Sequence, residues 1–324
     1  MTIGVIGGGA WGTALAQVAA GSGDVLLWAR EAEAVAAINE AHENSLFLPG
    51  VPLSPAVRAT TALAGLRECD MLLVVTPAQH LRAILADFGE TRMPLILCAK
   101  GIEAGSLKLM SEVAADVQPL ASIAVLSGPT FAHEVAAGLP AAVTLACENE
   151  SLARSLAERL ARPFFRPYLS SDVIGAEIGG AVKNVLAIAC GVVEGRGLGQ
   201  NARAALISRG FAEMTRFGLA KGARPETLAG LSGLGDLVLT CSSTSSRNFS
   251  LGKGIGEGRA AADLLADRRS VAEGAFTAPV LQQAAREAGV DMPVVDAVCA
   301  LLEGEAKVED VIGGLLSRPI RAEH

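Results

Sequence analysis

The sequence predicts an α/β domain followed by an all-helical domain. Up to about residue 170, short apolar runs of strand length alternate with helical patterns. Beyond that point only helical patterns follow, with no convincing strand. Strands separated by helices are typical of a parallel sheet that is covered on both faces. We therefore expect an α/β domain over residues 1–170 and an all-helical substrate and catalytic domain over residues 171–324.

A glycine-rich turn indicates what the first domain binds. Gly7, Gly9 and Gly12 form G-x-G-x-x-G between an apolar run at residues 3–6 and an alanine-rich helix at residues 10–20. In a Rossmann-type dinucleotide-binding domain, these glycines allow a tight turn, a close approach of the pyrophosphate, and close packing of helix on strand. Free N–H groups at the helix start then face the anion. The alternative is a glycine-rich turn that only connects core elements.

Composition excludes several classes of protein. The chain has 324 residues, of which 51% are hydrophobic, and its net charge is -7. This charge argues against binding of nucleic acid or an anionic membrane through bulk attraction. The six cysteines are scattered, without a C-x-x-C pattern or a histidine pair at metal spacing. We expect reduced thiols, no disulfide framework and no metal.

Two apolar stretches do not read as targeting or membrane segments. Residues 1–20 lack a basic N-terminal region and are interrupted by glycines. Residues 178–193 are short for a membrane span and contain Lys183 and Asn184. We expect a cytoplasmic protein without a membrane span.

The strands of the first domain place polar residues at one edge. A second strand is predicted at residues 24–28. Others are predicted at 71–75, 94–98, 122–126, 141–146 and 164–168, with helices at 63–69 and 151–161 and a loop at 42–55. Ligands of parallel sheets bind at the carboxyl ends of strands. Arg30, Thr76-Pro77, Lys100 and residues 128–130 follow strand ends and are expected to share one rim.

The second domain is predicted as a series of helices. They cover residues 172–194, 201–221, 279–288 and 294–302, with another beginning at Arg224-Pro225 and loops at 230–235 and 241–246.

Arg30 bears on the choice of cofactor. It lies about 18 residues past Gly12, where an acidic residue would bind the adenosine ribose and select NAD. An arginine suits the 2′-phosphate of NADP, but Glu31 and Glu33 follow closely, so NAD is not excluded. The alternative is a solvated arginine at a helix start.

Lys183 is the most informative single residue. It is predicted in the middle of a helix, surrounded by glycine, alanine, valine and leucine. Lysine rarely occupies such a place unless it is paired or used. Partial burial lowers the pKa of a lysine and allows proton exchange near neutral pH. Alternatively, its stem crosses apolar surface while the ammonium group reaches water.

Other polar residues admit two interpretations each. Lys100 closes a strand at the predicted rim, where a ligand role is favoured over a surface charge. Asn184 could bind substrate or cap a helix, and Asp236 could orient Lys183 or cap the next helix. The loop at residues 245–248 offers hydroxyls, a guanidinium and an amide, which suit a phosphate monoester, but it could be only a polar loop.

Several motifs together resemble the bacterial-type NAD(P)-dependent glycerol-3-phosphate dehydrogenase family. The resemblance covers almost the whole chain, in order. The motifs are the glycine turn with Trp11 and Thr13, residues 48–50, 100–103, 127–132 and 181–184, Asn201, and residues 204–209, 233–240, 246–248 and 271–274.

The resemblance implies a role for each matched residue. Lys183 would be the general acid/base at the C2 oxygen of dihydroxyacetone phosphate. The residues implied to hold glycerol phosphate are Lys100, Gly128, Thr130, Lys183, Asp236, Ser246, Arg247 and Asn248. Those implied to contact NADP or NAD are Gly7, Gly9, Ala10, Trp11, Gly12, Arg30, Lys100, Ala132, Arg247, Val271 and Glu273. Ala10 is often serine in the family, so one phosphate hydrogen bond would be absent here while the backbone cradle stays.

Two alternatives stay open at this point. A hydroxyacid dehydrogenase also joins a dinucleotide fold to a helical domain with a lysine and an asparagine, but acts on carboxylates. An NADP-sensing module would need the glycine turn without the use of Lys183, Asp236 and Arg247. The sequence does not fix the preference between NAD and NADP, feedback regulation or the oligomeric state, for which a homodimer is one option.

Overall fold

The chain forms two compact units. The computed structural model describes residues 1–266 and 272–317. Unit 1 comprises Met1–Gly180 and Ala223–Asp236, and unit 2 comprises Ala181–Gly222 and Leu237–His324. The division falls inside one long helix, α7 (Val173–Gly195), and a second segment after residue 222 returns to unit 1.

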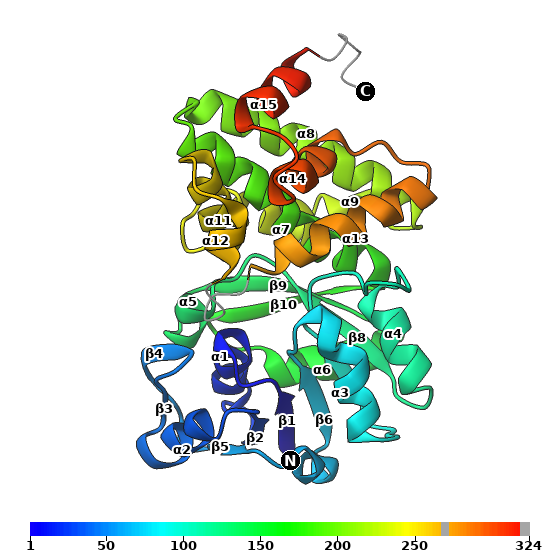
Figure 1. The fold of residues 1–324 in the computed structure, drawn as a ribbon. Coiled ribbons are helices and arrows are strands. Elements are labelled where there is room, and N and C mark those ends of the chain that lie inside the picture. Colours follow the sequence, from blue (N-terminus) through cyan, green and yellow to red (C-terminus); the bar gives the residue numbers. More distant parts are fainter. Residues whose placement is uncertain (267–271, 318–324) are drawn as a thin grey trace. The chain divides into compact units, whose positions relative to one another are not determined.

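Unit 1 is built on one eight-stranded sheet with the strand order β10-β9-β8-β7-β6-β1-β2-β5 (Figure 1). The strands are β1 (Thr2–Ile6), β2 (Asp24–Trp28), β5 (Val57–Thr60), β6 (Met71–Val74), β7 (Leu95–Leu97), β8 (Ile123–Ser127), β9 (Ala141–Ala146) and β10 (Phe165–Ser170). All neighbouring pairs are parallel except β8 and β9.

The expected parallel sheet is confirmed except at one position, the antiparallel pairing of β8 with β9. The connection from β8 to β9 contains only the short helix α5 (Ala132–Ala136). Five helical residues span only about 7.5 Å, which does not return the chain to the opposite edge of the sheet. β9 consequently begins at the edge where β8 ends and runs in the opposite direction.

Helices and turns complete unit 1, and the last two of them lie in the segment that returns after residue 222. They are α1 (Ala10–Ala19), α2 (Ala32–Ala41), η1 (Leu63–Glu68), η2 (Ala78–His80), α3 (Leu81–Phe88), α4 (Met110–Val117), α6 (Glu150–Leu160), α9 (Pro225–Leu228) and η3 (Leu231–Gly235). The predicted loop at 42–55 contains a small antiparallel hairpin, β3 (Glu43–Asn44) and β4 (Leu48–Pro52). The predicted loop at 230–235 forms a π-helical turn, η3, instead.

Alternate residues of each strand enter two separate cores, one on each face of the sheet. Val5 and Leu73 belong to one hydrophobic cluster, whereas Ile6 and Leu72 belong to the other. Because successive side chains of a strand point to opposite faces, strands buried on both sides read as unbroken apolar runs. This is the pattern from which the strands were predicted.

The carboxyl ends of β7, β6, β1 and β2 lie side by side at one edge of the sheet. The Gly7 N–H donates to the Trp28 carbonyl at 3.0 Å, and the Val75 N–H donates to the Ile6 carbonyl at 2.8 Å. These neighbouring strands are parallel, so the residues that follow them share an edge. The predicted common rim of Arg30, Thr76, Lys100 and Gly128 is confirmed.

Unit 2 is helical throughout the part that the structure describes. Besides most of α7, it contains α8 (Gly199–Ala220), α11 (Arg247–Gly256), α12 (Ala261–Leu265), α13 (Glu273–Glu287), α14 (Pro293–Leu302) and α15 (Val308–Leu316). Helix α10 (Asp236–Thr240) begins at the division between the units. Helices α7 and α11 approach closely: a Cβ on Gly191 would lie 2.1 Å from the Phe249 carbonyl oxygen, and a Cβ on Gly252 would lie 1.9 Å from the Ile188 oxygen.

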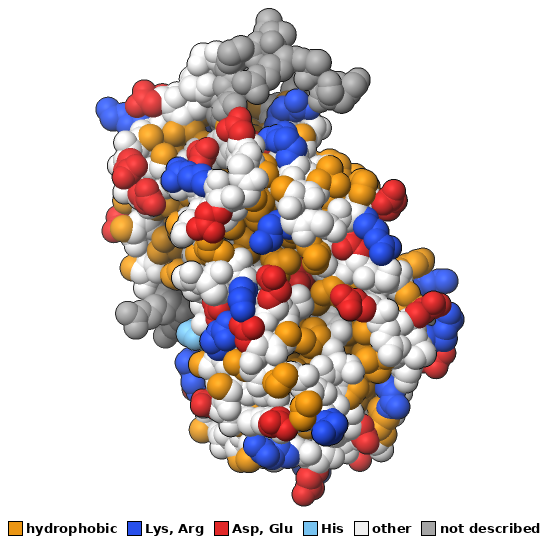
Figure 2. Space-filling model, turned by 90° about the vertical axis from the view of Figure 1, so that its right-hand side faces the viewer, with side chains coloured by type: hydrophobic (Ala, Val, Ile, Leu, Met, Phe, Trp, Pro, Cys, Tyr) orange, Lys and Arg blue, Asp and Glu red, His pale blue; other side chains and the backbone are white. Residues whose placement is uncertain are grey.

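Helix α7 is long and apolar enough, by length and composition, to cross a membrane. It is the one such helix among residues 1–266 and 272–317, and 89% of its apolar window is buried inside the protein. That burial is typical of the core helix of a soluble protein. On the surface seen in Figure 2, acidic and basic side chains are interspersed rather than gathered by sign.

Candidate functional site

The glycine turn has the geometry that the motif requires. Gly7 has a φ of +122°, and a Cβ there would lie 2.5 Å from the Val75 carbonyl oxygen. A Cβ on Gly12 would lie 1.8 Å from the Gly7 oxygen, so any side chain would push α1 away from the turn. A Cβ on Gly9 would meet nothing within 4 Å, which leaves the space beside the turn open. The start of α1 therefore faces open space with unsatisfied N–H groups, which suits a phosphate.

Arg30 follows β2 at the same edge of the sheet. Its side chain is 82% exposed and forms an ion pair with Glu31, with Nη2 2.8 Å from Oε1. Glu31 is the N-cap residue of α2. Arg30 is thus accessible to a ligand, but the neighbouring carboxylate already partly neutralises it.

Lys100 and Asp236 form the strongest polar contact at the rim of unit 1. The Lys100 ammonium donates to Asp236 Oδ2 at 2.6 Å and to the Gly128 carbonyl at 3.3 Å. The Asp236 side chain is fully buried, whereas 15% of the Lys100 side chain is exposed. Such a partner offsets part of the cost of burying a carboxylate, and the exposed part of Lys100 can still reach a ligand.

The remaining predicted residues of unit 1 lie near the same strand ends. The Thr130 hydroxyl donates to the Gly128 carbonyl at 3.3 Å, so Lys100 and Thr130 share one acceptor. Ala132 is the first residue of α5. Ala10 and Trp11 begin α1, and both pack partly against the hydrophobic cluster on that face of the sheet.

Lys183 is buried in unit 2, as expected. Its side chain is only 6% exposed, and its ammonium group donates to the Thr240 hydroxyl at 2.9 Å. The alternative in which the ammonium reaches bulk water does not fit this burial. An amine can donate a proton when it is protonated and accept one when it is neutral, so a lysine at this place can take part in proton transfer.

Thr240 is a site candidate that sequence reasoning did not single out. It lies four residues after Asp236 in α10, and residues four apart share one face of a helix. The spacing from Asp236 was the available signal. A threonine hydroxyl has no distinctive chemistry in a sequence, and only the fold brings it to Lys183.

The predicted phosphate loop forms the start of α11. Ser246 is the N-cap residue, and its hydroxyl accepts from the Phe249 N–H at 3.2 Å. The Asn248 side chain is buried and accepts from the Gly274 N–H at 2.9 Å. Arg247 is exposed in the first turn of this ten-residue helix. Two of the three residues thus hold the local structure, while the guanidinium faces solvent beside a helix start that favours anions.

The last predicted contacts lie at the start of α13. Glu273 is its first residue and Gly274 the second. A Cβ on Gly274 would lie 2.5 Å from the Asn184 carbonyl oxygen, so this helix start packs tightly on α7. The Asn184 side chain is buried. Val271 lies outside the described residues.

Two buried carboxyl groups away from the predicted site have raised pKa values. Glu177 accepts from the Ser111 N–H at 2.7 Å and from its hydroxyl at 2.6 Å, and burial raises the pKa of Glu177 to about 7. Glu213 accepts from the Val294 N–H at 2.8 Å, and burial likewise raises the pKa of Glu213 to about 7. Both carboxyls cap helix starts, at α4 and α14, which is a structural role.

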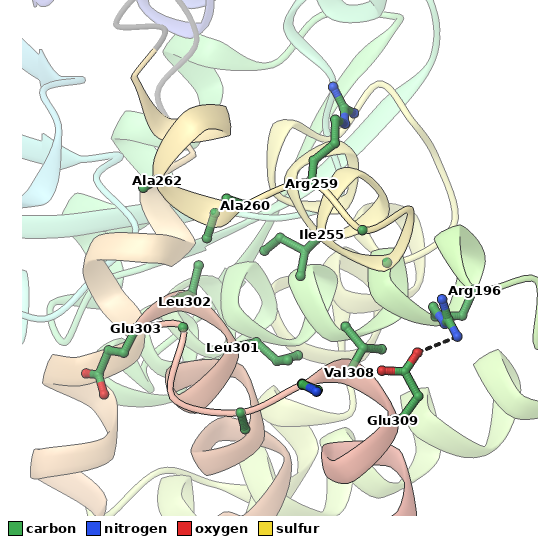
Figure 3. A pocket seen from close by; sticks show the side chains of 16 residues that line it. Arg196, Ile255, Arg259, Ala260, Ala262, Leu301, Leu302, Glu303, Val308 and Glu309 are labelled. Atoms are coloured by element: carbon green, nitrogen blue, oxygen red, sulfur yellow. Dashed lines mark ion pairs between the residues drawn. The ribbon is translucent and has the colours of Figure 1, made fainter.

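A surface pocket in unit 2 does not coincide with any predicted site residue. It has a volume of about 410 Å³ and lies between the α11–α12 turn and the α14–α15 turn (Figure 3). Ile255, Leu301 and Val308 line it, and the ion pair between Arg196 and Glu309 lies at one side. No group of three or more possible metal ligands occurs within residues 1–266 and 272–317. All six cysteines are free and buried.

Two family models match the chain. The model described as NAD-dependent glycerol-3-phosphate dehydrogenase N-terminus matches residues 2–153. The model described as NAD-dependent glycerol-3-phosphate dehydrogenase C-terminus matches residues 172–313. Together they span nearly the whole sequence.

Individual relatives match over their full length. A protein of Sphingopyxis alaskensis named glycerol-3-phosphate dehydrogenase [NAD(P)+] 1 is 64% identical over 99% of this chain and 97% of its own. A Novosphingobium aromaticivorans protein named glycerol-3-phosphate dehydrogenase [NAD(P)+] is 65% identical over 99% and 98%. The crystal structure of glycerol-3-phosphate dehydrogenase from Coxiella burnetii is 37% identical, with a TM-score of 0.93 over 98% of this chain and 99% of that one.

Proposed function

Since the chain belongs to the NAD-dependent glycerol-3-phosphate dehydrogenase family, we propose that it reduces dihydroxyacetone phosphate to sn-glycerol 3-phosphate, reversibly, with NADPH or NADH. The product would supply the backbone of glycerophospholipids. We further propose a cytoplasmic location. A homodimer is the assembly to test first, by light scattering of the purified protein.

The residues of unit 1 fit a dinucleotide. The open space beside Gly9 admits a diphosphate, and the start of α1 offers N–H donors to it. Arg30 at the end of β2 is placed for a 2′-phosphate, and its pairing with Glu31 leaves room for NADH as well. In this proposal Gly7, Gly9, Ala10, Trp11 and Gly12 hold the diphosphate side. Ala132 would contribute a further contact from unit 1, and we also assign cofactor contacts outside this unit to Arg247, Val271 and Glu273.

We assign substrate binding to the charged and polar groups of the predicted site. Arg247 would bind the phosphate through two parallel hydrogen bonds, for which a guanidinium is suited. Lys100, oriented by Asp236, would bind a substrate oxygen. Gly128, Thr130, Ser246 and Asn248 would also hold the glycerol phosphate in this proposal. Binding energy from the phosphate positions the carbonyl carbon for reaction.

Lys183 would supply the proton in the reduction. NADPH, when bound, supplies the hydride to the C2 carbonyl carbon. The protonated Lys183 amine would donate to the C2 oxygen as negative charge develops there, and the neutral amine would accept that proton in the reverse direction. The hydrogen bond to Thr240 holds the amine in one orientation. We also propose that Asp236 orients Lys183 and tunes its proton transfer.

One observation carries the proposal furthest. Lys183 is 6% exposed in the middle of α7, and its ammonium group donates to the Thr240 hydroxyl at 2.9 Å. An amine held at this place can give a proton to a substrate oxygen or take one from it, which is the role proposed for Lys183.

The substrate class can be tested with three compounds. Dihydroxyacetone phosphate, unphosphorylated dihydroxyacetone and a 2-keto acid are offered to the purified protein with NADPH. We expect oxidation of NADPH with dihydroxyacetone phosphate and a value of kcat/KM at least about 100-fold lower for dihydroxyacetone, since a charged hydrogen bond pair is lost. Faster turnover of the 2-keto acid would instead indicate a hydroxyacid dehydrogenase.

A further inference from the structure

A buried asparagine holds the glycine turn from behind. Asn44 lies in β3, the first strand of the small hairpin, and its side chain is fully buried. Its Nδ2 donates to the Gly8 carbonyl at 2.8 Å and to the Thr13 hydroxyl at 2.7 Å. Its Oδ1 accepts from the Phe47 N–H at 3.2 Å. Both protons of the amide and its oxygen are therefore engaged, which also fixes the orientation of the amide group.

The Gly8 carbonyl is held by two donors. Besides Asn44, the Thr13 hydroxyl reaches the same oxygen at 3.4 Å, and Thr13 is fully buried in the first turns of α1. Neither Asn44 nor Thr13 faces the open side of the turn. They contact the carbonyl from the protein interior, as components of the unit 1 fold.

The planarity of the peptide group links the direction of the Gly8 carbonyl to the direction of the Gly9 N–H. In a trans peptide the C=O and the following N–H point in opposite directions. Anchoring the Gly8 oxygen toward Asn44 therefore turns the Gly9 N–H away from Asn44. The space beside Gly9 is open, because a Cβ there would meet nothing within 4 Å. If the Gly8–Gly9 peptide rotated, this donor would be lost to an anion at the turn.

We infer that Asn44 is a positioning residue for cofactor binding: through the Gly8 carbonyl, its amide sets the Gly9 N–H toward the diphosphate of NADPH or NADH. This inference rests on the proposed function, because it assigns the ligand of the turn as a dinucleotide. Asn44 does not touch the cofactor. It acts on the direction of one backbone donor.

The test uses Asn44→Asp, which preserves shape and removes both donated protons. The dissociation constant of NADPH, measured by fluorescence titration, is expected to rise at least about tenfold, as expected for loss of a hydrogen bond to a charged group. Thr13→Val removes the second donor at nearly constant volume and should raise the dissociation constant of NADPH about threefold. This second variant tests the inference even if Asn44→Asp does not fold.

Gln118 provides a matched control in the same unit. Its buried amide also donates to two carbonyls, those of Leu85 and Gly89, and accepts from the Thr91 N–H. Leu85 lies in α3, Gln118 directly follows α4, and Gly89 and Thr91 lie between α3 and β7, all away from the glycine turn. Gln118→Glu should lower the melting temperature while leaving the NADPH dissociation constant within about twofold, because it removes equivalent bonds elsewhere.

Two ligand fragments separate positioning from a general structural role. ADP-ribose contains the diphosphate, and adenosine 2′-phosphate does not. Asn44→Asp should weaken ADP-ribose in parallel with NADPH and leave adenosine 2′-phosphate unchanged. Equal weakening of both fragments, or NADPH affinity unchanged in both Asn44→Asp and Thr13→Val, would overturn the inference. If the wild-type protein bound no NADPH at all, the proposed function would fail instead.

Discussion

The Lys100 ammonium lies 2.6 Å from the Asp236 carboxylate, although the two residues are 136 positions apart in the sequence. Lys100 follows β7, and Asp236 begins α10 in the segment that returns to unit 1. The pair thus joins two distant parts of the chain at the edge of the sheet. The two side chains are unequally buried, because Asp236 is fully buried and 15% of the Lys100 side chain is exposed.

That inequality predicts an order of stabilities. Lys100→Met leaves the Asp236 carboxylate buried without this partner and is expected to destabilise the protein by about 3–5 kcal/mol. Adding Asp236→Asn to this variant removes the buried charge and should restore part of that loss. Chemical unfolding of the wild type, both single variants and the double variant measures the order. A double variant less stable than Lys100→Met alone would contradict the account.

The hydrogen bond between Lys183 and Thr240 predicts a selective loss of turnover. Thr240→Val removes the hydroxyl at nearly constant volume, so the amine loses its fixed orientation and kcat should fall about 10- to 100-fold. Thr240→Ser preserves the hydroxyl and should stay within a few-fold of the wild type. The dissociation constant of NADPH should not change in either variant. Equal kcat values for Thr240→Val and the wild type would remove Thr240 from the mechanism.

The residues that could be predicted from the sequence are those whose role is indicated by their immediate neighbours in the chain. The glycine turn is recognisable because its three glycines, a preceding strand and a following helix are consecutive in the chain. Lys183 is recognisable because a lysine among apolar residues is anomalous within its own helix. Neither inference needs knowledge of distant contacts.

The roles that sequence could not give depend on partners far away in the chain. Asp236 next to glycines reads equally well as a helix cap, and its pairing with Lys100 appears only once the segment 223–236 has returned to unit 1. Asn44 lies in a stretch rich in Pro, Gly and Asn that reads as a loop, because its two short strands are held by hairpin pairing rather than by an apolar pattern. Strands β8 and β9 are both mostly apolar, so their composition does not reveal that they pair in antiparallel.

The ion pair between Arg30 and Glu31 predicts how cofactor preference can be shifted. Arg30→Ala should weaken NADPH about tenfold and leave NADH nearly unchanged, because only NADPH carries the 2′-phosphate. Glu31→Gln frees the guanidinium from its partner and should raise the preference for NADPH a few-fold. Dissociation constants for both cofactors measure the ratio. A loss of NADH affinity equal to that of NADPH in Arg30→Ala would argue against this role.

The raised pKa of Glu177 predicts a specific dependence of stability on pH. The folded-state pKa of about 7 exceeds the ordinary value of 4.5, so the folded protein binds the additional proton between these values. Its contribution to stability is fully present below about pH 4.5 and is lost as the pH rises to about 7, by roughly 3 kcal/mol. Urea unfolding at pH 5 and pH 8 should show a smaller decrease for Glu177→Gln than for the wild type.

An exposed glutamate provides the control for that measurement. The Glu150 side chain is 83% exposed, so Glu150→Gln should follow the wild-type pH dependence. If Glu177→Gln and the wild type lost the same stability between the two pH values, the buried carboxyl would not hold a proton near neutral pH.

The central claim is that the chain moves a hydride from NADPH to C2 of dihydroxyacetone phosphate with Lys183 handling the proton. The most direct measurement supplies stereospecifically deuterated [4-²H]NADPH, in separate reactions for its two C4 epimers, and analyses the product by mass spectrometry and NMR. We predict sn-glycerol 3-phosphate with one deuterium at C2 from one epimer, and no such product with Lys183→Ala although NADPH still binds. Oxidation of NADPH without labelled glycerol 3-phosphate, or unchanged turnover by Lys183→Ala, would contradict the account.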